Sequence, residues 1–128
     1  MNIPAHYFTL AQAFQHGGEL IQNSDAFGNE LETELASICT TAEQIQQETA
    51  EYLSYYFLDD EDEDAANATD IQPDALLLFA ADGAGNHFGM DFSQSDTAPR
   101  VLYWDDGILQ WRTIAHSLDD FFKLFTPD

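Results

Sequence analysis

Basic side chains are scarce in this sequence. Arg100, Arg112 and Lys123 are its only Lys or Arg residues, against 24 acidic ones, so the formal net charge of the 128-residue chain is −21. Proteins that bind nucleic acid neutralise its phosphates with Lys and Arg, so we expect no nucleic-acid partner. An anionic membrane surface would repel this chain, so we expect no membrane partner. The charge instead favours a basic partner, although it says nothing about the fold.

Cysteine and long apolar runs are scarce as well. The lone Cys39 cannot form a disulfide within the chain, and such cysteine usage is typical of a reducing compartment. Without a His or Lys nearby in sequence, Cys39 is expected to be a small apolar residue rather than a nucleophile. No stretch approaches the roughly 20 apolar residues of a membrane helix. The first ten residues lack the basic region of a signal peptide. We therefore expect a cytoplasmic protein.

What the sequence does contain is enough apolar material for one core. Hydrophobic residues make up 45% of the chain, and its length is typical of a single domain, expected over residues 1–128. Pro4 suits the first turn of a helix, and the glycines of residues 16–18 would end that helix. Its apolar stripe is predicted to be Tyr7, Leu10, Ala11 and Phe14.

Residues 19–39 allow two interpretations. Leu31, Thr33 and Leu35 alternate with glutamates, which favours a strand with one wet face, whereas Leu31, Leu35 and Ile38 could begin a helix. Turns and a short strand are our expectation. A second helix is predicted after Thr40, which has capping-box spacing to Glu43. Its buried face would hold Ile45, Thr49, Tyr52, Leu53 and Tyr56.

An acidic segment follows this helix. Residues 59–74 read as an exposed loop, because like charges repel one another. Its six successive acidic residues could bind a basic partner, and they are our candidate contact residues: Asp59, Asp60, Glu61, Asp62, Glu63 and Asp64. They do not form an EF-hand calcium loop, because that motif requires Gly at its sixth position and Glu at its twelfth, where Asp64 and Asp70 stand.

From Ala75 onward the pattern is that of strands. Four are predicted, over residues 76–81, 87–92, 101–105 and 108–113, with Asp106 and Gly107 as the tight turn of the last hairpin. In the second strand Phe88, Met90 and Phe92 should face one way, and His87, Gly89 and Asp91 the other.

A last helix is predicted after Ser117, which suits an N-cap. Its buried stripe would be Leu118, Phe121, Phe122 and Phe125. The order of elements predicts an α+β fold, with N-terminal helices and a C-terminal helix packed on a mostly antiparallel sheet.

The glycine-rich stretch ADGAGNHFGMDF, residues 81–92, could hold a phosphate, a metal ion or a turn. A phosphate cradle needs a helix after the glycines and usually a lysine, whereas a strand is expected here and no lysine is near. Asp82, His87 and Asp91 could offer metal ligands, but their spacing along a strand suits a single ion poorly.

A hairpin is the interpretation that fits this stretch best. Gly83 and Gly85 can supply the positive φ angles of a turn. Gly89 would mark a bulge or close packing within the following strand.

The order of these motifs resembles the SUKH superfamily, the group named for its Smi- and Knr-type members. "IPAHYFTLAQAFQHGG", "LLLFAADGAGNHFGMDF", "PRVLYWDDG" and "IAHSLDDFFKLF" carry the resemblance, from about Ile3 to Phe125. The acidic loop departs from the pattern as a local elaboration, and the usual lead-in to the first helix is short. The structural motif residues would be Gly83, Gly85, Gly89, Asp91, Trp104, Gly107, Phe121 and Phe122.

The resemblance implies a Smi/Knr-like α+β fold without catalytic residues, and we expect no cofactor or metal. Many bacterial members are immunity proteins that neutralise nuclease or deaminase toxin domains, and fungal members act as regulatory interaction hubs. A non-enzymatic acidic immunity protein that binds a basic toxin domain is therefore the first hypothesis. A regulatory or scaffold module of the same fold is the second, and a carboxylate- or metal-dependent hydrolase is a remote third.

Other candidate sites have ordinary structural explanations. Asp105 and Asp106 invite an acid–base role, but adjacent strand residues face opposite ways and Asp106 is expected in a turn. The four histidines lack the spacing of a zinc site. Trp104 and Trp111 could anchor an interface, although in a strand meander they are more often core or cross-strand pairs.

Overall fold

The computed structural model describes residues 1–57 and 71–128. The candidate contact residues Asp59–Asp64 lie outside these ranges. Within the described ranges the helical elements are α1 (His6–Ala13), α2 (Ala42–Tyr52), η1 (Leu53–Tyr56), η2 (Pro73–Ala75) and α4 (Leu118–Phe122). In the described ranges no helix has the length and apolar content to cross a membrane.

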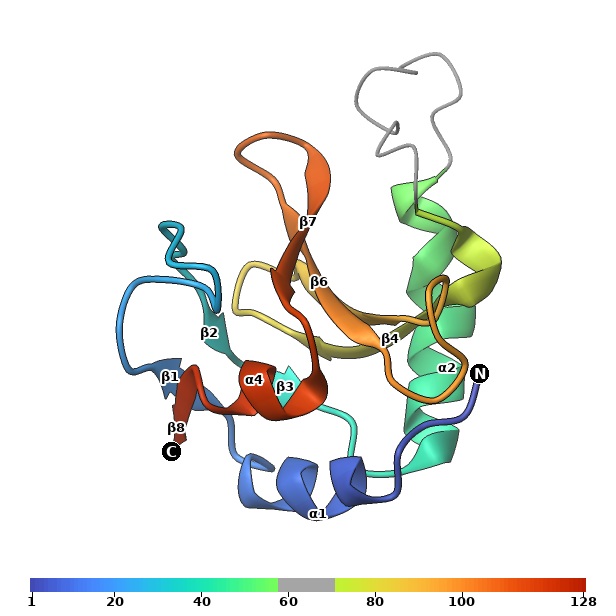
Figure 1. The fold of residues 1–128 in the computed structure, drawn as a ribbon, viewed down its shortest axis with the longest axis horizontal. Helices are drawn as coiled ribbons and strands as arrows, with labels where there is room; N and C mark the ends of the chain where they lie inside the picture. Colours follow the sequence, from blue (N-terminus) through green and yellow to red (C-terminus); the bar gives the residue numbers. More distant parts are fainter. Residues whose placement is uncertain (58–70) are drawn as a thin grey trace.

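The strands form two antiparallel sheets (Figure 1). The main sheet has the order β3-β4-β5-β6-β7, and the smaller sheet has the order β2-β1-β8. The strands of the main sheet are β3 (Ser37–Ile38), β4 (Leu76–Ala81), β5 (His87–Asp91), β6 (Arg100–Asp105) and β7 (Gln110–Ala115). Those of the smaller sheet are β1 (Gly18–Leu20), β2 (Glu34–Leu35) and β8 (Phe125–Pro127). The predicted α+β class is confirmed.

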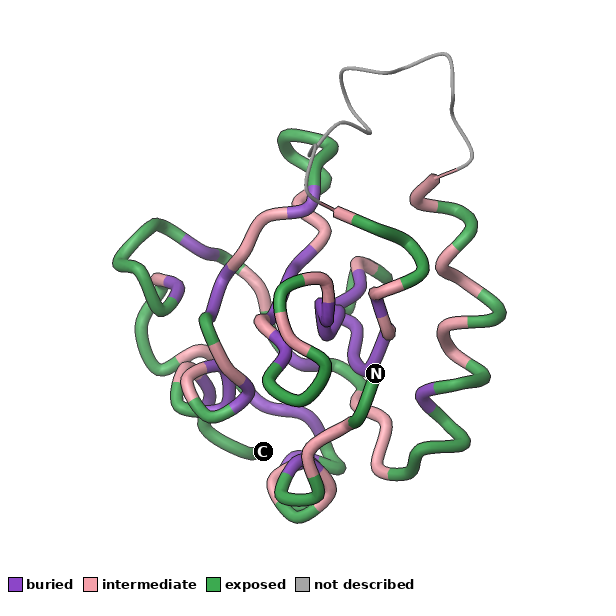
Figure 2. Tube along the Cα trace, turned by 45° about the vertical axis from the view of Figure 1, so that its right-hand side comes forward, coloured by how far each residue is buried: buried purple, intermediate pink, exposed green. Residues whose placement is uncertain are grey.

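The main sheet buries a different cluster on each face, because side chains alternate along its strands. One face packs against α1 and α4, with Phe79, Phe88 and Tyr103 in the same cluster as Tyr7 and Phe121. The other face meets α2 and η1 in a smaller cluster that comprises Leu76, Leu78, Leu102, Trp111 and partly buried neighbours such as Tyr52, Tyr56 and Trp104. Figure 2 shows buried positions concentrated in the strands, whereas α2 buries only Ile45 fully.

The alternation predicted for residues 87–92 matches the structure. Phe88, Met90 and Phe92 all join the α1/α4 cluster, while His87 turns to the opposite face and meets Tyr52 and Tyr56. This single strand therefore contributes apolar side chains to one core and a polar side chain to the α2 side.

Several predicted boundaries are wrong by a few residues. Helix α1 begins after Ala5, so Pro4 precedes its N-cap instead of lying in its first turn. Thr41, not Thr40, caps α2: its hydroxyl accepts from the Gln44 N–H at 3.2 Å. The reciprocal acceptor is Gln44 rather than Glu43, since its side chain accepts from the Thr40 N–H at 2.7 Å. The arrangement resembles a capping box shifted by one residue, except that Gln44 accepts from the residue before the N-cap.

The C-terminal predictions also need correction. Asp105 pairs with Gln110, so four residues connect β6 and β7 and strand β7 begins at 110 rather than 108. The Asp105 side chain accepts from the Gly107 N–H at 3.0 Å, and the positive φ of 53° falls on Leu109 instead of Gly107. Phe125 is buried as predicted, but α4 has already ended and Phe125 opposite Leu20 belongs to β8.

Residues 19–39 contain more strand than expected. The alternating segment gives the two-residue strand β2, and β1 and β3 on either side were not predicted. Leu31 and Leu35 are both buried. Short strands of this kind are stabilised by partners distant in sequence, here β8 and β4, so local pattern alone does not reveal them.

Candidate functional site

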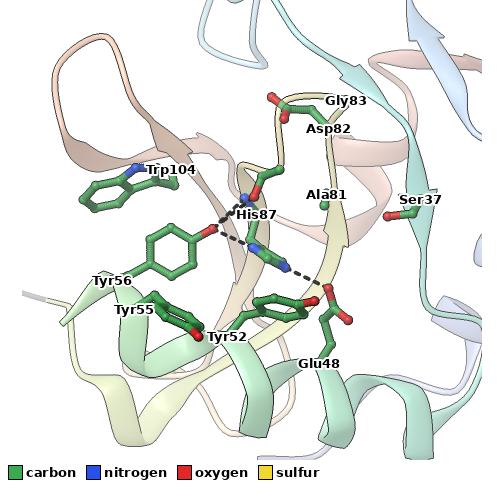
Figure 3. Close-up of a pocket in the computed structure, with 11 residues that line it drawn as sticks. Ser37, Glu48, Tyr52, Tyr55, Tyr56, Ala81, Asp82, Gly83, His87 and Trp104 are labelled. Carbon is green, nitrogen blue, oxygen red and sulfur yellow. Dashed lines mark hydrogen bonds and ion pairs between the residues drawn. The ribbon is translucent and has the colours of Figure 1, made fainter. Parts of the chain in front are cut away.

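A cleft of about 650 Å³ lies between the α2–η1 helical segment and the main sheet. It is the candidate site, and we call it the aromatic cleft. Side chains from both layers surround it in Figure 3. Its lining residues are Ser37, Glu48, Tyr52, Tyr55, Tyr56, Ala81, Asp82, Gly83, Gly85, His87 and Trp104.

His87 forms the floor of the aromatic cleft. It is only 4% exposed, yet both ring nitrogens have partners: Nε2 lies 2.7 Å from Glu48 Oε2, and Nδ1 lies 2.5 Å from the Tyr56 hydroxyl. The His87 backbone N–H also donates to that hydroxyl at 3.2 Å. The three contacts of His87 are all satisfied when Nε2–H donates to Glu48 and Tyr56 donates to Nδ1, rather than to the Gly85 carbonyl at 3.4 Å. Helix, 3-10 turn and strand are thus joined through one imidazole.

The end of α2 and the 3-10 helix η1 carry three tyrosines, two of which contact this histidine. The Tyr52 ring lies 5.1 Å from the His87 ring at an interplanar angle of 35°, and Tyr56 meets it edge-on at 5.6 Å. Tyr55 projects outward and is 69% exposed. Trp104 completes the wall, with its ring 5.1 Å from Tyr56.

The glycine-rich stretch forms the rim of the aromatic cleft, and its interpretation as a turn is correct. Gly85 has φ +89°, whereas Gly83 does not have a positive φ. The Gly83 N–H instead donates to Glu34 Oε1 at 2.7 Å, which ties the turn to β2. Gly89 packs closely, since a Cβ there would lie 2.7 Å from Leu76 Cδ1.

Asp82 organises this turn from beneath. Its Oδ1 accepts from the N–H groups of Ala84 and Asn86 at 3.0 and 2.9 Å. Its Oδ2 accepts from the hydroxyls of Thr33 and Tyr103 at 2.9 and 2.6 Å. Four donors fill the capacity of one carboxylate, so the role of Asp82 is to hold the turn.

Asp82, His87 and Asp91, the weighed metal ligands, are each engaged separately. Asp91 is buried in an ion pair with Arg100 at 2.6 Å and accepts from the Ser93 N–H. Nowhere in residues 1–57 and 71–128 do three His, Cys, Asp or Glu side chains gather as a metal site requires. The geometry therefore favours internal scaffolding over metal binding at these residues.

The Glu48–His87–Tyr56 chain has the connectivity of a proton relay, but its chemistry argues against a nucleophile. Burial is the main reason that the pKa of Tyr56 is raised to about 12, and the His87 N–H offsets only part of the effect. The phenol therefore stays protonated at neutral pH. Burial likewise raises the pKa of Cys39 to about 12, with Glu48 adding to the effect. Cys39 is thus an inert, half-buried thiol.

The remaining sequence candidates have structural roles. Asp105 accepts from Gly107 and from Arg112, the latter at 3.1 Å. Trp104 and Trp111 are a cross-strand pair with rings 5.5 Å apart. Phe121 and Phe122 are both buried in the main core.

Sequence reasoning missed the partnership of Glu48 with His87. The two residues are 39 positions apart, and no local pattern connects them. The available signal was His87 on the polar face of a predicted strand, combined with Tyr52 and Tyr56 on one face of a predicted helix. Only the packing of that helix on that strand shows that these side chains meet.

Comparison with known families agrees with the fold described above. The model of the SUKH_6 family, described as SMI1-KNR4 cell-wall, matches residues 13–122. The chain therefore belongs to the SMI1-KNR4 family, which confirms the resemblance found in the sequence. Because the match begins at the last residue of α1, residues 3–12 of the first-helix motif lie outside it and residues 13–18 lie within it. No curated protein and no solved structure matches the chain significantly.

Proposed function

We propose that this protein is a non-enzymatic binding module that neutralises a basic toxin domain by direct contact, as an immunity protein of a bacterial cell. Membership of the SMI1-KNR4 family supports a protein-binding role. The net charge of −21 favours a partner of positive charge, because opposite potentials attract over long range and accelerate encounter.

The placement of the arginines is the observation that carries this proposal. Arg100 is only 16% exposed and pairs with the buried Asp91 at 2.6 Å. Arg112 is 22% exposed and bridges Asp25 and Asp105 at 3.0 and 3.1 Å. Both arginine charges are therefore paired with carboxylates within the fold. Lys123 is the only other basic side chain in the sequence. Apart from the exposed Lys123, the outer surface is dominated by carboxylates, as a surface that attracts a basic domain requires.

The acidic residues Asp59–Asp64 are proposed as the first point of contact. They are the densest run of negative charge in the sequence and follow η1, which borders the aromatic cleft. A toxin domain that acts on nucleic acid carries a basic surface for its substrate. Such a surface would be drawn to this run as it is to phosphates.

Capture of the native partner tests the proposed function directly. Tagged protein is used to recover bound proteins from the native cell, and these are identified by mass spectrometry. A basic nuclease or deaminase domain whose activity falls on adding this protein is the expected result. A regulatory or enzymic partner without toxicity would favour the scaffold hypothesis, and an acidic partner would overturn the proposal.

Charge neutralisation tests the role of the acidic run. Asp59, Asp60, Asp62 and Asp64 are changed to Asn, and Glu61 and Glu63 to Gln. We expect a lower association rate for the captured partner and a flatter salt dependence, because screening acts over about 8 Å at physiological ionic strength. The dissociation rate should change less, since it depends on the buried patch.

The control removes an equal number of negative charges, six, from exposed positions elsewhere, namely Glu19, Glu30, Glu32, Glu43, Asp74 and Asp106. It should lower the association rate less than the variant of the acidic run does. Equal effects from both sets would mean that total charge, and not the run, steers the partner.

A further inference from the structure

The aromatic cleft combines aromatic faces with negative charge. Tyr52, Tyr55 and Trp104 border it, and Glu48 and Asp82 place carboxylates in its lining. None of the three basic residues of the sequence lines it. An aromatic face attracts a cation through its quadrupole, and the attraction strengthens where water is partly excluded.

Glu48 retains capacity for a ligand. Its Oε2 is held by His87, whereas its Oε1 makes no hydrogen bond within the described ranges. The side chain is 30% exposed and lines the aromatic cleft. Because His87 already fixes the orientation of this carboxylate, binding a cation would cost less side-chain conformational entropy.

The electrostatic environment of the aromatic cleft is negative. Glu51 is the main reason that the pKa of Tyr52 is raised, followed by burial and by Glu48. The same carboxylates that disfavour a phenolate favour a cation beside that ring. Tyr55 is exposed, and its ring centroid lies 6.3 Å from that of Tyr52, which extends the aromatic surface toward solvent.

We propose that the aromatic cleft receives an arginine side chain of the basic partner, with the guanidinium stacked on the tyrosines and donating to Glu48 Oε1. This inference rests on the proposed function for the identity of the partner. Arginine suits the cleft better than lysine, because guanidinium is planar, weakly hydrated, and able to stack and donate at once. A volume of about 650 Å³ is in the range of pockets that hold small ligands.

An NMR titration tests the proposal without a partner. The probe is N-acetylarginine amide, and the signals are the Trp104 indole N–H and the backbone amides of Gly85 and His87. Saturable shifts at these signals are expected, strongest for the arginine probe, weaker for N-acetyllysine amide, and absent for the neutral isostere N-acetylcitrulline amide. Equal binding of the citrulline probe would overturn the cationic assignment. Shifts of the same size at Asp119 and Asp120 would indicate general charge attraction and would also overturn it.

Two variants locate the ligand. Glu48→Gln keeps an acceptor for His87 but removes the charge, and Tyr55→Ala removes an exposed ring with little risk to folding. Each should weaken the arginine probe about fivefold or more, the scale expected for one cation–π or charge-assisted contact. The matched control, Glu43→Gln, removes one exposed charge from the same helix outside the cleft and should leave affinity within about twofold. Unchanged affinity in both cleft variants would refute the assignment.

The two proposals fail separately. A titration without saturable shifts would remove the arginine site and leave the partner free to dock elsewhere on the acidic surface. Capture of an acidic partner would overturn the proposed function and leave the titration result unaffected.

Discussion

Replacing Asp82 by Ala should destabilise the fold strongly, because four donors depend on its carboxylate. The N–H groups of Ala84 and Asn86 lie at exposed and half-buried positions and can turn to water, whereas the buried hydroxyl of Tyr103 would lose its acceptor. A hydrogen bond to a charged group contributes roughly 1.5–3 kcal/mol, so the buried Tyr103 bond alone sets a loss of about 2–3 kcal/mol in the free energy of unfolding. That is a large share of the 5–15 kcal/mol typical of a domain.

The conservative change Asp82→Asn should cost less, about 1–2 kcal/mol, since its oxygen can still accept from both N–H groups. Its new amide would face two hydroxyl oxygens that are able to accept. Urea denaturation followed by tryptophan fluorescence measures both losses, with Trp104 and Trp111 reporting on the sheet. The control Asp106→Ala, at an exposed loop position, should stay within about 0.5 kcal/mol. A loss below about 1 kcal/mol for Asp82→Ala, or an equal loss for both Asp82 variants, would refute the account of the turn.

Three further predictions concern the turn and the buried acids. Gly85→Val should cost about 1–3 kcal/mol because of its positive φ, and Gly83→Val should cost less, because its Cβ would meet the flexible end of a glutamate side chain; equal melting temperatures would contradict this. At pH 8, Cys39 should react with a disulfide reagent about 30- to 60-fold more slowly than an unperturbed thiol, because a pKa of about 12 against 9.0 lowers the thiolate fraction while the more basic thiolate is the better nucleophile; rapid labelling of folded protein would contradict burial. Burial raises the pKa of Tyr56 and Tyr103 from 10.0 to about 12, so the unfolded chain ionises first. Their contribution to stability should be complete below pH 10 and lost as the pH rises to 12. The free energy of unfolding should therefore fall less steeply between pH 9 and 12 in Tyr103→Phe than in the unchanged protein.

The parts of the fold that the sequence predicts are those with a local cause. Strand β5 alternates because one face is buried against α1 and α4, and its Phe88 and Met90 reveal this directly. The parts that it does not predict depend on distant partners. Phe125 continues the helical spacing of α4, yet it forms β8 because Leu20 lies opposite to pair with it. Tertiary pairing here outweighs local periodicity.

The sequence likewise predicts only part of the aromatic cleft. The spacing of Tyr52 and Tyr56 predicts a shared helix face, and the alternation of β5 predicts a polar side for His87. The switch to 3-10 geometry at Leu53 has no equally clear sequence signal, although it decides which tyrosine reaches the histidine and which stays exposed. Glu48 gave no signal at all, because its partner comes from another layer of the fold.

The structural explanation of the glycine-rich turn does not compete with a functional one. The positive φ of Gly85 and the four bonds of Asp82 fix where the chain re-enters β5, and β5 begins at His87. That residue contacts Glu48, and Glu48 is the carboxylate that we propose binds a cation in the aromatic cleft. A turn at the rim of the aromatic cleft therefore also fixes the position of Glu48, through His87. Damage to the turn should reach the cleft through His87, so variants of Gly85 that still fold should shift the His87 ring signals before they alter the outer acidic surface.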